Sequence, residues 1–101
     1  MMYKTRRAKA CDIPQAVKDK VLERDNGQCV FCFNGVAAAN AHYISRAQGG
    51  LGIEQNILTL CGVCHDRYDK TADRKQMKEF FKRYLQSKYA DWNEKNLYYK
   101  K

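Results

Sequence analysis

Two matched pairs of cysteines constrain this chain more than any other feature of its sequence. Cys29 and Cys32 enclose two residues, Cys61 and Cys64 enclose two more, and residues 33–60 separate the pairs. A C-x-x-C turn presents two thiolates to one ion, and two such turns complete a tetrahedral site with no open coordination position. The spacing therefore predicts one structural zinc ion held by four thiolates.

Two other uses of paired cysteines share part of this pattern. A redox-active dithiol of the thioredoxin type needs a single C-x-x-C within a βαβ pattern, and the sequence shows no such pattern. An iron–sulfur cluster also takes four thiolates, so this alternative stays open. Cys11, the fifth cysteine, lies outside both pairs.

The chain is short and strongly basic. Its 101 residues suffice for one domain with a thin core, and small domains of this kind often need a metal or disulfides for stability. Lys and Arg total 19 against 11 for Asp and Glu, which gives a net charge of +8. Such an excess favours a polyanionic partner, with nucleic acid as the first choice and an anionic membrane surface as the competitor.

The sequence predicts a cytoplasmic protein. No apolar run approaches the roughly 20 residues that a transmembrane helix needs. The basic N-terminal residues are not followed by an apolar segment, as they would be in a signal peptide. Because thiols stay reduced in the cytoplasm, the cysteines are expected to bind metal rather than to form disulfides.

Hydrophobic periodicity predicts two longer helices on either side of two short strands. Apolar residues recur at Ile13, Val17 and Val21, the spacing of an amphipathic helix that residues 25–27 should end. Residues 1–11 lack periodicity and are expected to form a loose basic arm. The other elements are expected in this order: a strand within 36–44 that ends near position 42, a glycine-rich loop over 45–52, a strand over 57–60, a short helix over about 63–69, and a long helix that begins near 73.

Three polar residues near the cysteine pairs are candidates for function. His42 falls where the first strand meets the glycine-rich loop, Asn56 precedes the second strand, and His65 follows Cys64 directly. The second C-x-x-C turn would therefore fix the start of the helix that carries His65. The chain has no other histidines, which favours a functional role for the two over a structural one.

The segments around these residues resemble the HNH endonucleases, and more narrowly the small zinc-containing HNH proteins often carried by phages and prophages. The resemblance rests on residues 41–50 (AHYISRAQGG) and 54–65 (EQNILTLCGVCH), and it covers about residues 13–70. It implies an α+β, ββα-metal fold, in which two strands and a helix surround one catalytic divalent ion. The single domain would then comprise a basic arm over 1–12, the HNH core over 13–70 and a C-terminal helical extension over 71–101, with helices flanking the core at both ends.

The resemblance assigns a role to each candidate residue. His42 matches the general base that takes a proton from the attacking water. His65 matches a ligand of the catalytic ion, which would offset charge on the phosphate and on the leaving oxygen. Asn56 matches the middle residue of the motif, whose side chain mainly orients the loop and the strand that carries the general base.

One position departs from the family pattern. Many members have Asp or His just before the general base as a second metal ligand, and this chain has Ala41. Asp69 lies four residues after His65 and shares its helix face, so it is the expected substitute. The expected ion is Mg²⁺, Mn²⁺, Ni²⁺ or Zn²⁺.

The function implied by the resemblance is that of a metal-dependent DNA endonuclease, a phosphodiester hydrolase acting on double-stranded DNA. Arg24, Arg46 and Arg67 are the expected phosphate contacts. Ala41 favours the alternative of a zinc-pinned DNA-binding module with weak or no catalysis, and a zinc-stabilised protein-interaction domain is the third interpretation. Besides DNA, the expected partners are a second copy of the chain or a phage or host DNA-processing protein, and no membrane.

Overall fold

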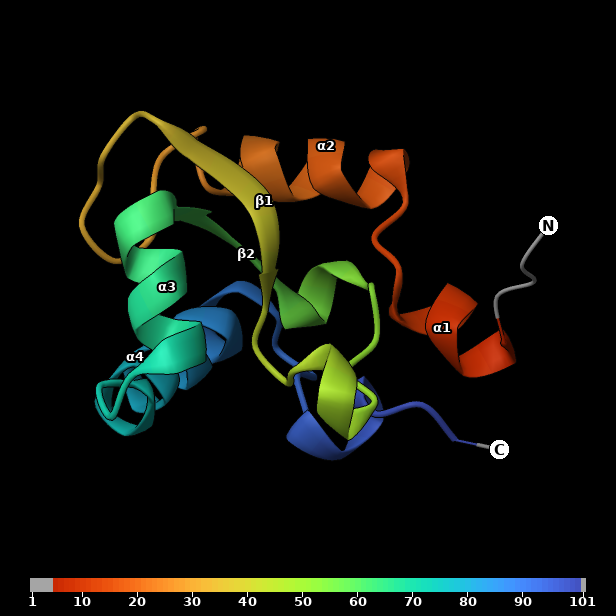
Figure 1. Cartoon of the computed structure of the whole chain (residues 1–101). Helices are drawn as coiled ribbons and strands as arrows, with labels where there is room; N and C mark the ends of the chain where they lie inside the picture. Colours follow the sequence, from red (N-terminus) through yellow and green to blue (C-terminus); the bar gives the residue numbers. More distant parts are fainter. Residues whose placement is uncertain (1–4, 101) are drawn as a thin grey trace, which may run out of the picture.

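A computed structural model describes residues 5–100, which form a mixed α+β fold (Figure 1). This confirms the α+β class, while the finer ββα-metal assignment stays a prediction. None of the helices in the described residues is long and apolar enough to cross a membrane. The elements in chain order are α1 (Arg6–Cys11), α2 (Gln15–Arg24), β1 (Ala37–His42), the 3₁₀ helices η1 (Arg46–Gln48) and η2 (Glu54–Asn56), β2 (Ile57–Cys61), α3 (Gly62–Lys70), α4 (Arg74–Lys88) and the 3₁₀ helix η3 (Glu94–Leu97).

The two strands pair antiparallel and form a two-stranded sheet. The register shifts between Ala39 and Ala41, so Asn40 forms a β-bulge, and His42 ends β1 opposite Ile57. A bulge increases the local twist and re-aims the side chains beside it. Every residue of β2 is buried, as expected for a short, nearly continuous apolar run.

Helices pack around this sheet and complete the core. α2 packs against both strands, while α3 packs against β2 and α4. Figure 1 shows α2 at the top of the view and α3 with α4 at the left, with the strands between them. The rings of Tyr68 on α3 and Phe81 on α4 are buried and meet edge to face, with centroids 5.0 Å apart.

The chain leaves α2 through a tight reversal that the sequence predicts. Asn26 and Gly27 adopt positive φ values of 56° and 66°, which the αL region allows at little cost for these two residue types. The helix ends at Arg24, immediately before this reversal. It begins at Gln15 rather than near Ile13, because the extended backbone of the preceding proline occupies the N-cap position.

The N-terminal segment differs from the loose arm predicted over residues 1–11. Its residues from Arg6 onward form the helix α1, and the Arg7 guanidinium donates to the Ala47 carbonyl oxygen at 2.8 Å. Gly52 packs so closely against this segment that a Cβ there would lie 1.7 Å from a carbonyl oxygen just after α1. Contacts with a distant loop, rather than periodicity, hold this six-residue helix, which explains why the pattern did not predict it. The first four residues of the predicted arm lie outside the described residues.

The C-terminal tail packs back on the body of the protein. Trp92 donates from Nε1 to the Gln55 carbonyl oxygen at 2.8 Å, and its ring meets the Tyr43 ring with centroids 5.6 Å apart. Leu97 is buried, and its carbonyl oxygen accepts from the Leu51 amide at 2.8 Å. The tail therefore supports the loop that joins the two strands.

Candidate metal centre

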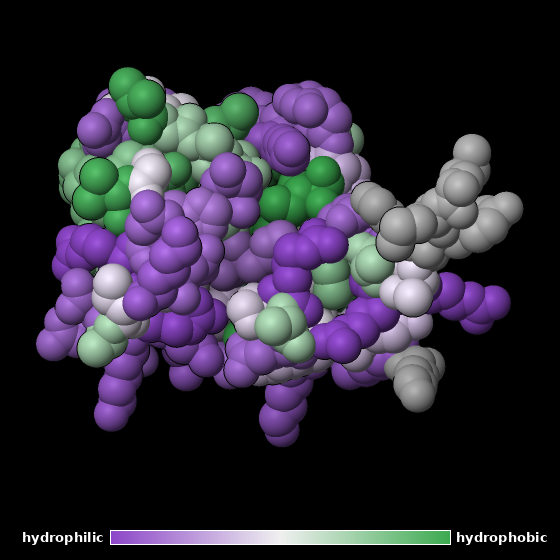
Figure 2. All heavy atoms as spheres, in the orientation of Figure 1, coloured by the Kyte–Doolittle hydropathy of each residue, from purple (hydrophilic) through white to green (hydrophobic). Residues whose placement is uncertain are grey.

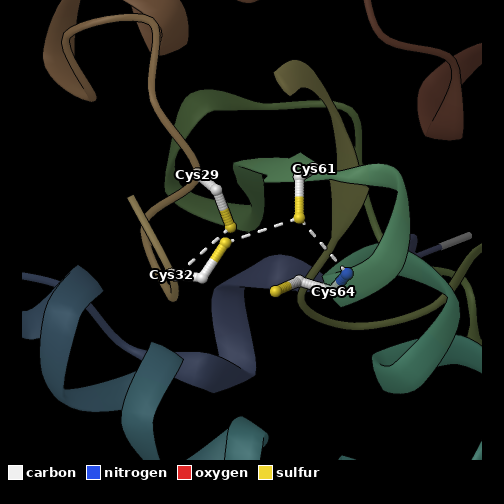
Figure 3. A group of neighbouring side chains, drawn as sticks. All are labelled: Cys29, Cys32, Cys61 and Cys64. Atoms are coloured by element: carbon white, nitrogen blue, oxygen red, sulfur yellow. Dashed lines mark hydrogen bonds between the residues drawn. The ribbon is translucent and has the colours of Figure 1, made fainter. Parts of the chain in front are cut away.

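Four cysteine side chains converge where β2 leads into α3. Cys29 and Cys32 lie in the loop between α2 and β1, Cys61 is the last residue of β2, and Cys64 lies in the first turn of α3. Figure 3 shows their sulfur atoms turned toward one another from these segments. The four sulfur atoms all lie within 4.8 Å of one another, and those of Cys32 and Cys61 are 3.5 Å apart. The grouping predicted from the cysteine spacing is therefore present.

Both C-x-x-C turns have the same local hydrogen bonding. The Cys32 amide donates to the Cys29 sulfur at 3.5 Å, and the Cys64 amide donates to the Cys61 sulfur at 3.4 Å. In the first turn, Phe33 reverses the chain with a φ of 66°. In the second, Cys61 is the N-cap of α3, so the start of the helix turns the chain. Each turn thus directs an amide at the sulfur that precedes it.

The loop with the first cysteine pair is bound to the strand that ends at the second. The Val30 amide donates to the Thr59 carbonyl oxygen at 3.0 Å, which joins the loop to β2. Within the loop, the Cys29 amide donates to the Asn34 carbonyl oxygen at 2.9 Å. These bonds fix the two pairs relative to each other.

Burial and hydrogen bonds act in opposite directions on the cysteine pKa values. Burial acts to raise the pKa of the Cys29 thiol, but the amides of Cys32, Cys61 and Phe31 outweigh it and lower the pKa to about 7. Burial raises the pKa of Cys64, and the neighbouring sulfur atoms raise it further. A bound cation would displace the remaining protons, because the thiolate is the form that binds metal.

The donor set and its spacing fit a single thiophilic ion. Four thiolates in a tetrahedral arrangement suit zinc or iron. With metal–sulfur bonds of about 2.3 Å, a tetrahedral site places its sulfur atoms about 3.8 Å apart, which agrees with the observed grouping. An iron–sulfur cluster distributes four thiolates over more than one iron atom and therefore spaces them more widely.

The metal centre is closed toward the core and open at one edge. Cys29, Cys61 and Cys64 are buried, while Cys32 is exposed. The surrounding segment 26–41 contains no Asp, Glu, Lys or Arg, although 30% of the chain is charged. The length of this uncharged stretch is a sequence signal for the exposed apolar surface beside the cysteines.

His42 and His65 line a separate cleft of about 1010 Å³ between β1, the loop over 45–52 and α3. The Nε2 atom of His42 lies 2.8 Å from the Cys11 carbonyl oxygen. Burial lowers the pKa of His42; the Cys11 carbonyl opposes this effect and the charge of Arg46 adds to it. The neutral ring therefore donates from Nε2. Two further cationic side chains, which no sequence motif marks, also line the cleft: Lys18 and Arg74.

His65 and Asp69 lie together on α3, as their i, i+4 spacing predicts. Nε2 of His65 lies 3.0 Å from Oδ2 of Asp69. Among residues 5–100, the only group of three or more His, Cys, Asp or Glu side chains close enough to share an ion is that of the four cysteines. The expected catalytic cation therefore has no support in the described residues, and the roles assigned to His42 and His65 stay predictions.

Asn56 is buried and holds the loop that follows β1. Its Oδ1 accepts from the Ile44 amide at 2.8 Å, and its Nδ2 donates to the carbonyl oxygens of Ile44 at 3.2 Å and Leu51 at 2.8 Å. These bonds connect the two ends of the loop and fix the backbone just after His42. The side chain thus pins the loop, while the place of Asn56 in a catalytic motif stays a prediction.

Arg24 does not have the role predicted for it. An arginine has five N–H donors, and all five of Arg24 are used within the protein. They donate to the Asp25 carboxylate, the Tyr89 hydroxyl and the carbonyl oxygens of Glu54 and Ile57. The side chain therefore stabilises the fold and has no donor left for phosphate.

The other two arginines lie in different surroundings. Arg46 lines the cleft and donates to the Cys11 carbonyl oxygen at 2.9 Å and to the Asp12 carboxylate at 2.8 Å. The Arg67 guanidinium lies 5.6 Å from the centroid of the Phe31 ring, beside the cysteine loop. Phosphate binding by these two arginines stays a prediction, as do DNA, a second copy of the chain and a DNA-processing protein as partners.

Comparison with known proteins contradicts the predicted activity. No family model matches the chain. The chain is similar to anaredoxin from Nostoc sp. (strain PCC 7120 / SAG 25.82 / UTEX 2576), with 36% identity over 52 residues, which cover 50% of this chain and 68% of that protein. That protein is named as a redoxin and not as a nuclease.

The predictions of a DNA endonuclease and of a phosphodiester hydrolase are therefore wrong, and so is the nuclease function that the HNH resemblance implies. The motifs led to a wrong prediction of activity because histidines and an asparagine beside a C-x-x-C turn do not by themselves specify a reaction. The assignment of the two strands and α3 to a ββα-metal core stays a prediction. At this identity and coverage, the chain belongs to the family of anaredoxin.

Proposed function

We propose that this protein transfers electrons through a single iron ion held by Cys29, Cys32, Cys61 and Cys64. The observation that carries the proposal is the grouping of their sulfur atoms within 4.8 Å. The name of the related anaredoxin supports a redox role. Iron bound by four thiolates supplies a one-electron couple, which zinc in the same site does not.

The groups around the four thiolates suit a metal centre that transfers electrons, not one that binds a substrate. Four protein ligands leave no open position for a substrate. The amides of Cys32 and Cys64 donate to the sulfur atoms of Cys29 and Cys61 at 3.5 and 3.4 Å. Such bonds stabilise negative charge on sulfur, so they favour the reduced, more negative state and raise the reduction potential.

The exposure of one ligand supports the same function. Cys32 is exposed, whereas the other three cysteines are buried. A partner protein can therefore approach one edge of the centre closely, while the core excludes water from the rest. Solvent exposure and hydrogen bonds to sulfur are two of the factors by which a protein sets the potential of a thiolate-bound iron.

A structural zinc ion is the second candidate for the same four thiolates. It is favoured because Cys29, Cys61 and Cys64 belong to the main apolar cluster of the core. A closed metal site at that position would stabilise a domain this small. Both ions take the same tetrahedral thiolate geometry, so spectroscopy must distinguish them.

Metal loading followed by voltammetry tests the proposal. The iron-loaded protein is expected to hold a single iron per chain, to absorb visible light through thiolate-to-iron charge transfer, and to give a reversible one-electron wave. Cys64→Ser should lose this wave, whereas Cys11→Ser should keep it, because Cys11 lies outside the four-cysteine group. An iron-loaded, folded protein without a reversible wave would contradict electron transfer and favour the structural zinc.

A further inference from the structure

We propose that the exposed surface around Cys32 docks an acidic electron-transfer protein. The inference rests on the proposed function and names the partner class for that centre. The surface, called the apolar rim below, is formed by four side chains: Phe33, Val36, Val63 and Phe80.

The apolar rim gathers the large hydrophobic side chains that are exposed in residues 5–100. Phe33 is 68% exposed, Val36 83%, Val63 70% and Phe80 41%. Single exposed apolar residues are ordinary, but a group of them rimmed by polar residues marks an interaction surface. Figure 2 shows hydrophobic side chains concentrated over the loop between α2 and β1 and the first turn of α3, while hydrophilic side chains cover most of the lower part of this face.

All four members of the rim lie close to the metal ligands. Phe33 follows Cys32 directly, Val36 lies three residues further on, and Val63 lies between the two cysteines of the second pair. Phe80 comes from α4, and its ring meets the ring of Phe31, inside the first C-x-x-C turn, with centroids 5.1 Å apart. Three members of the rim therefore lie within four residues of a cysteine ligand in the sequence, and the fourth contacts the first C-x-x-C turn.

The absence of charge on the cysteine loop favours a protein rather than a nucleic acid at this surface. Residues 26–41 contain no Lys or Arg, and phosphate contacts depend on those side chains. The same residues contain no Asp or Glu. Depletion of charge is typical of the centre of a protein–protein interface.

The charge beside the rim favours an acidic partner. The helix α4, which carries Phe80, has six cationic residues and one anionic residue. The whole chain has a net charge of +8. Such an excess accelerates encounters with an acidic protein and opposes docking of a second copy of this chain. A few apolar side chains form only a small contact, which suits the transient complexes of electron transfer.

Binding and electron transfer to one defined probe test the proposal. The probe is an acidic plant-type [2Fe–2S] ferredoxin, and basic cytochrome c is the comparison. The zinc-loaded, isotope-labelled chain is titrated with ferredoxin, and amide shifts are expected at residues 31–36, 62–64 and 79–83. The reduced probe then transfers one electron to the oxidised, iron-loaded chain, and the second-order rate constant of this step should fall as salt is added.

A double variant and a matched control separate the rim from the metal centre. Phe33→Asn with Val63→Ser removes exposed apolar surface, and asparagine tolerates the positive φ at position 33. We expect about a tenfold weaker association and a correspondingly slower transfer, with the reduction potential of the variant measured so that the rates are compared at equal driving force. Ala16→Ser changes an exposed residue on α2 and should match the wild type in every measurement.

The outcomes distinguish failure of docking from failure of the proposed function. If the double variant binds and transfers electrons as fast as the wild type, or if cytochrome c is the better partner, the docking proposal is wrong while the redox function stands. If the iron-loaded chain shows no reversible wave in voltammetry, the redox function fails, and the rim loses the electron-transfer partner proposed for it.

Discussion

The sulfur atoms of Cys32 and Cys61 lie 3.5 Å apart, although 29 positions separate the two residues in the chain. The first belongs to a loop without regular secondary structure, and the second ends β2. An ion held by both pairs would therefore join a loop to the sheet and to α3. The conformation of the loop should therefore depend on the bound metal, and metal binding should depend on the folded loop.

Loss of one buried thiolate should unfold the protein. Cys64→Ser leaves three ligands, and binding of a structural metal contributes roughly 10–16 kcal/mol in small metal-dependent domains. That exceeds or equals the net stability of about 5–15 kcal/mol of a typical domain. The variant is expected to lose its bound metal and its cooperative thermal unfolding transition, as measured by elemental analysis and circular dichroism.

Removing the metal from the wild type with a chelator should unfold the protein, as Cys64→Ser should. Cys11→Ser is the control for Cys64→Ser, because Cys11 is also buried but lies outside the four-cysteine group. It should retain the metal and lose at most about 1–3 kcal/mol. A folded, metal-free Cys64→Ser protein would show that the bonds between loop and strand suffice without an ion.

Removing the Asn56 side chain should destabilise the loop after β1. Asn56→Ala leaves the amide and carbonyl of Ile44 and the carbonyl of Leu51 without the partners they now have. A buried polar group without a partner costs about 1–3 kcal/mol, so urea unfolding should show a loss of about 3 kcal/mol. Gln55→Ala keeps the carbonyl oxygen that accepts from Trp92 and should change stability by less than about 0.5 kcal/mol. Equal losses in the two variants would refute the pinning role.

The sequence predicts those parts of the fold and the site that depend on local patterns. The spacing of the cysteines is enough to bring four thiolates together, and periodicity is enough to place α2, α3 and α4. The helix α1 and the network around Arg24 depend on contacts with residues about 30 or more positions away, which no local pattern encodes. The proposed redox role does not follow from the sequence pattern, because zinc and iron accept the same four thiolates and a cysteine spacing does not distinguish them.

The burial of His42 should make stability depend on pH. Its pKa lies below the usual value of 6.5 in the folded protein, so the unfolded chain takes up a proton first as the pH falls. The neutral His42 ring therefore contributes its full stabilisation above pH 6.5, the pKa of the unfolded chain. This stabilisation is lost as the pH falls from 6.5 through the lower pKa that His42 has in the folded protein. His42→Gln cannot titrate, so between pH 7.5 and 5.5 it should lose less stability than the wild type in urea unfolding of the zinc-loaded form. Identical pH dependence in the two proteins would mean that the His42 ring is not buried as described.

The contact of Gly52 with the N-terminal segment should not tolerate a methyl group. A Cβ at Gly52 would lie 1.7 Å from the Asp12 carbonyl oxygen, so Gly52→Ala must displace the backbone after α1. We expect a loss of about 2 kcal/mol or more and faster amide exchange in α1. Gly62→Ala is the matched control, because no atom lies within 4 Å of a Cβ there and alanine favours the start of α3. The docked position of α1 would be wrong if both substitutions were neutral.

Replacing Arg24 should lower the free energy of unfolding, because its guanidinium stabilises the fold. Arg24→Met removes the cation that pairs with the buried Asp25 carboxylate at 2.7 Å. It also removes the guanidinium donor from the Ile57 carbonyl oxygen and leaves the Glu54 carbonyl oxygen with the Ile57 amide as its donor. An unpaired buried charge costs about 3–5 kcal/mol, and the hydrogen bond from the Tyr84 hydroxyl to the same carboxylate offsets only part of it. Arg83→Met breaks an exposed i, i+4 pair on α4 and should cost at most about 0.5 kcal/mol. Urea unfolding of both variants measures the two losses. A loss of stability at Arg24 as small as that at Arg83 would contradict the structural role of the Arg24 guanidinium and leave it available for phosphate.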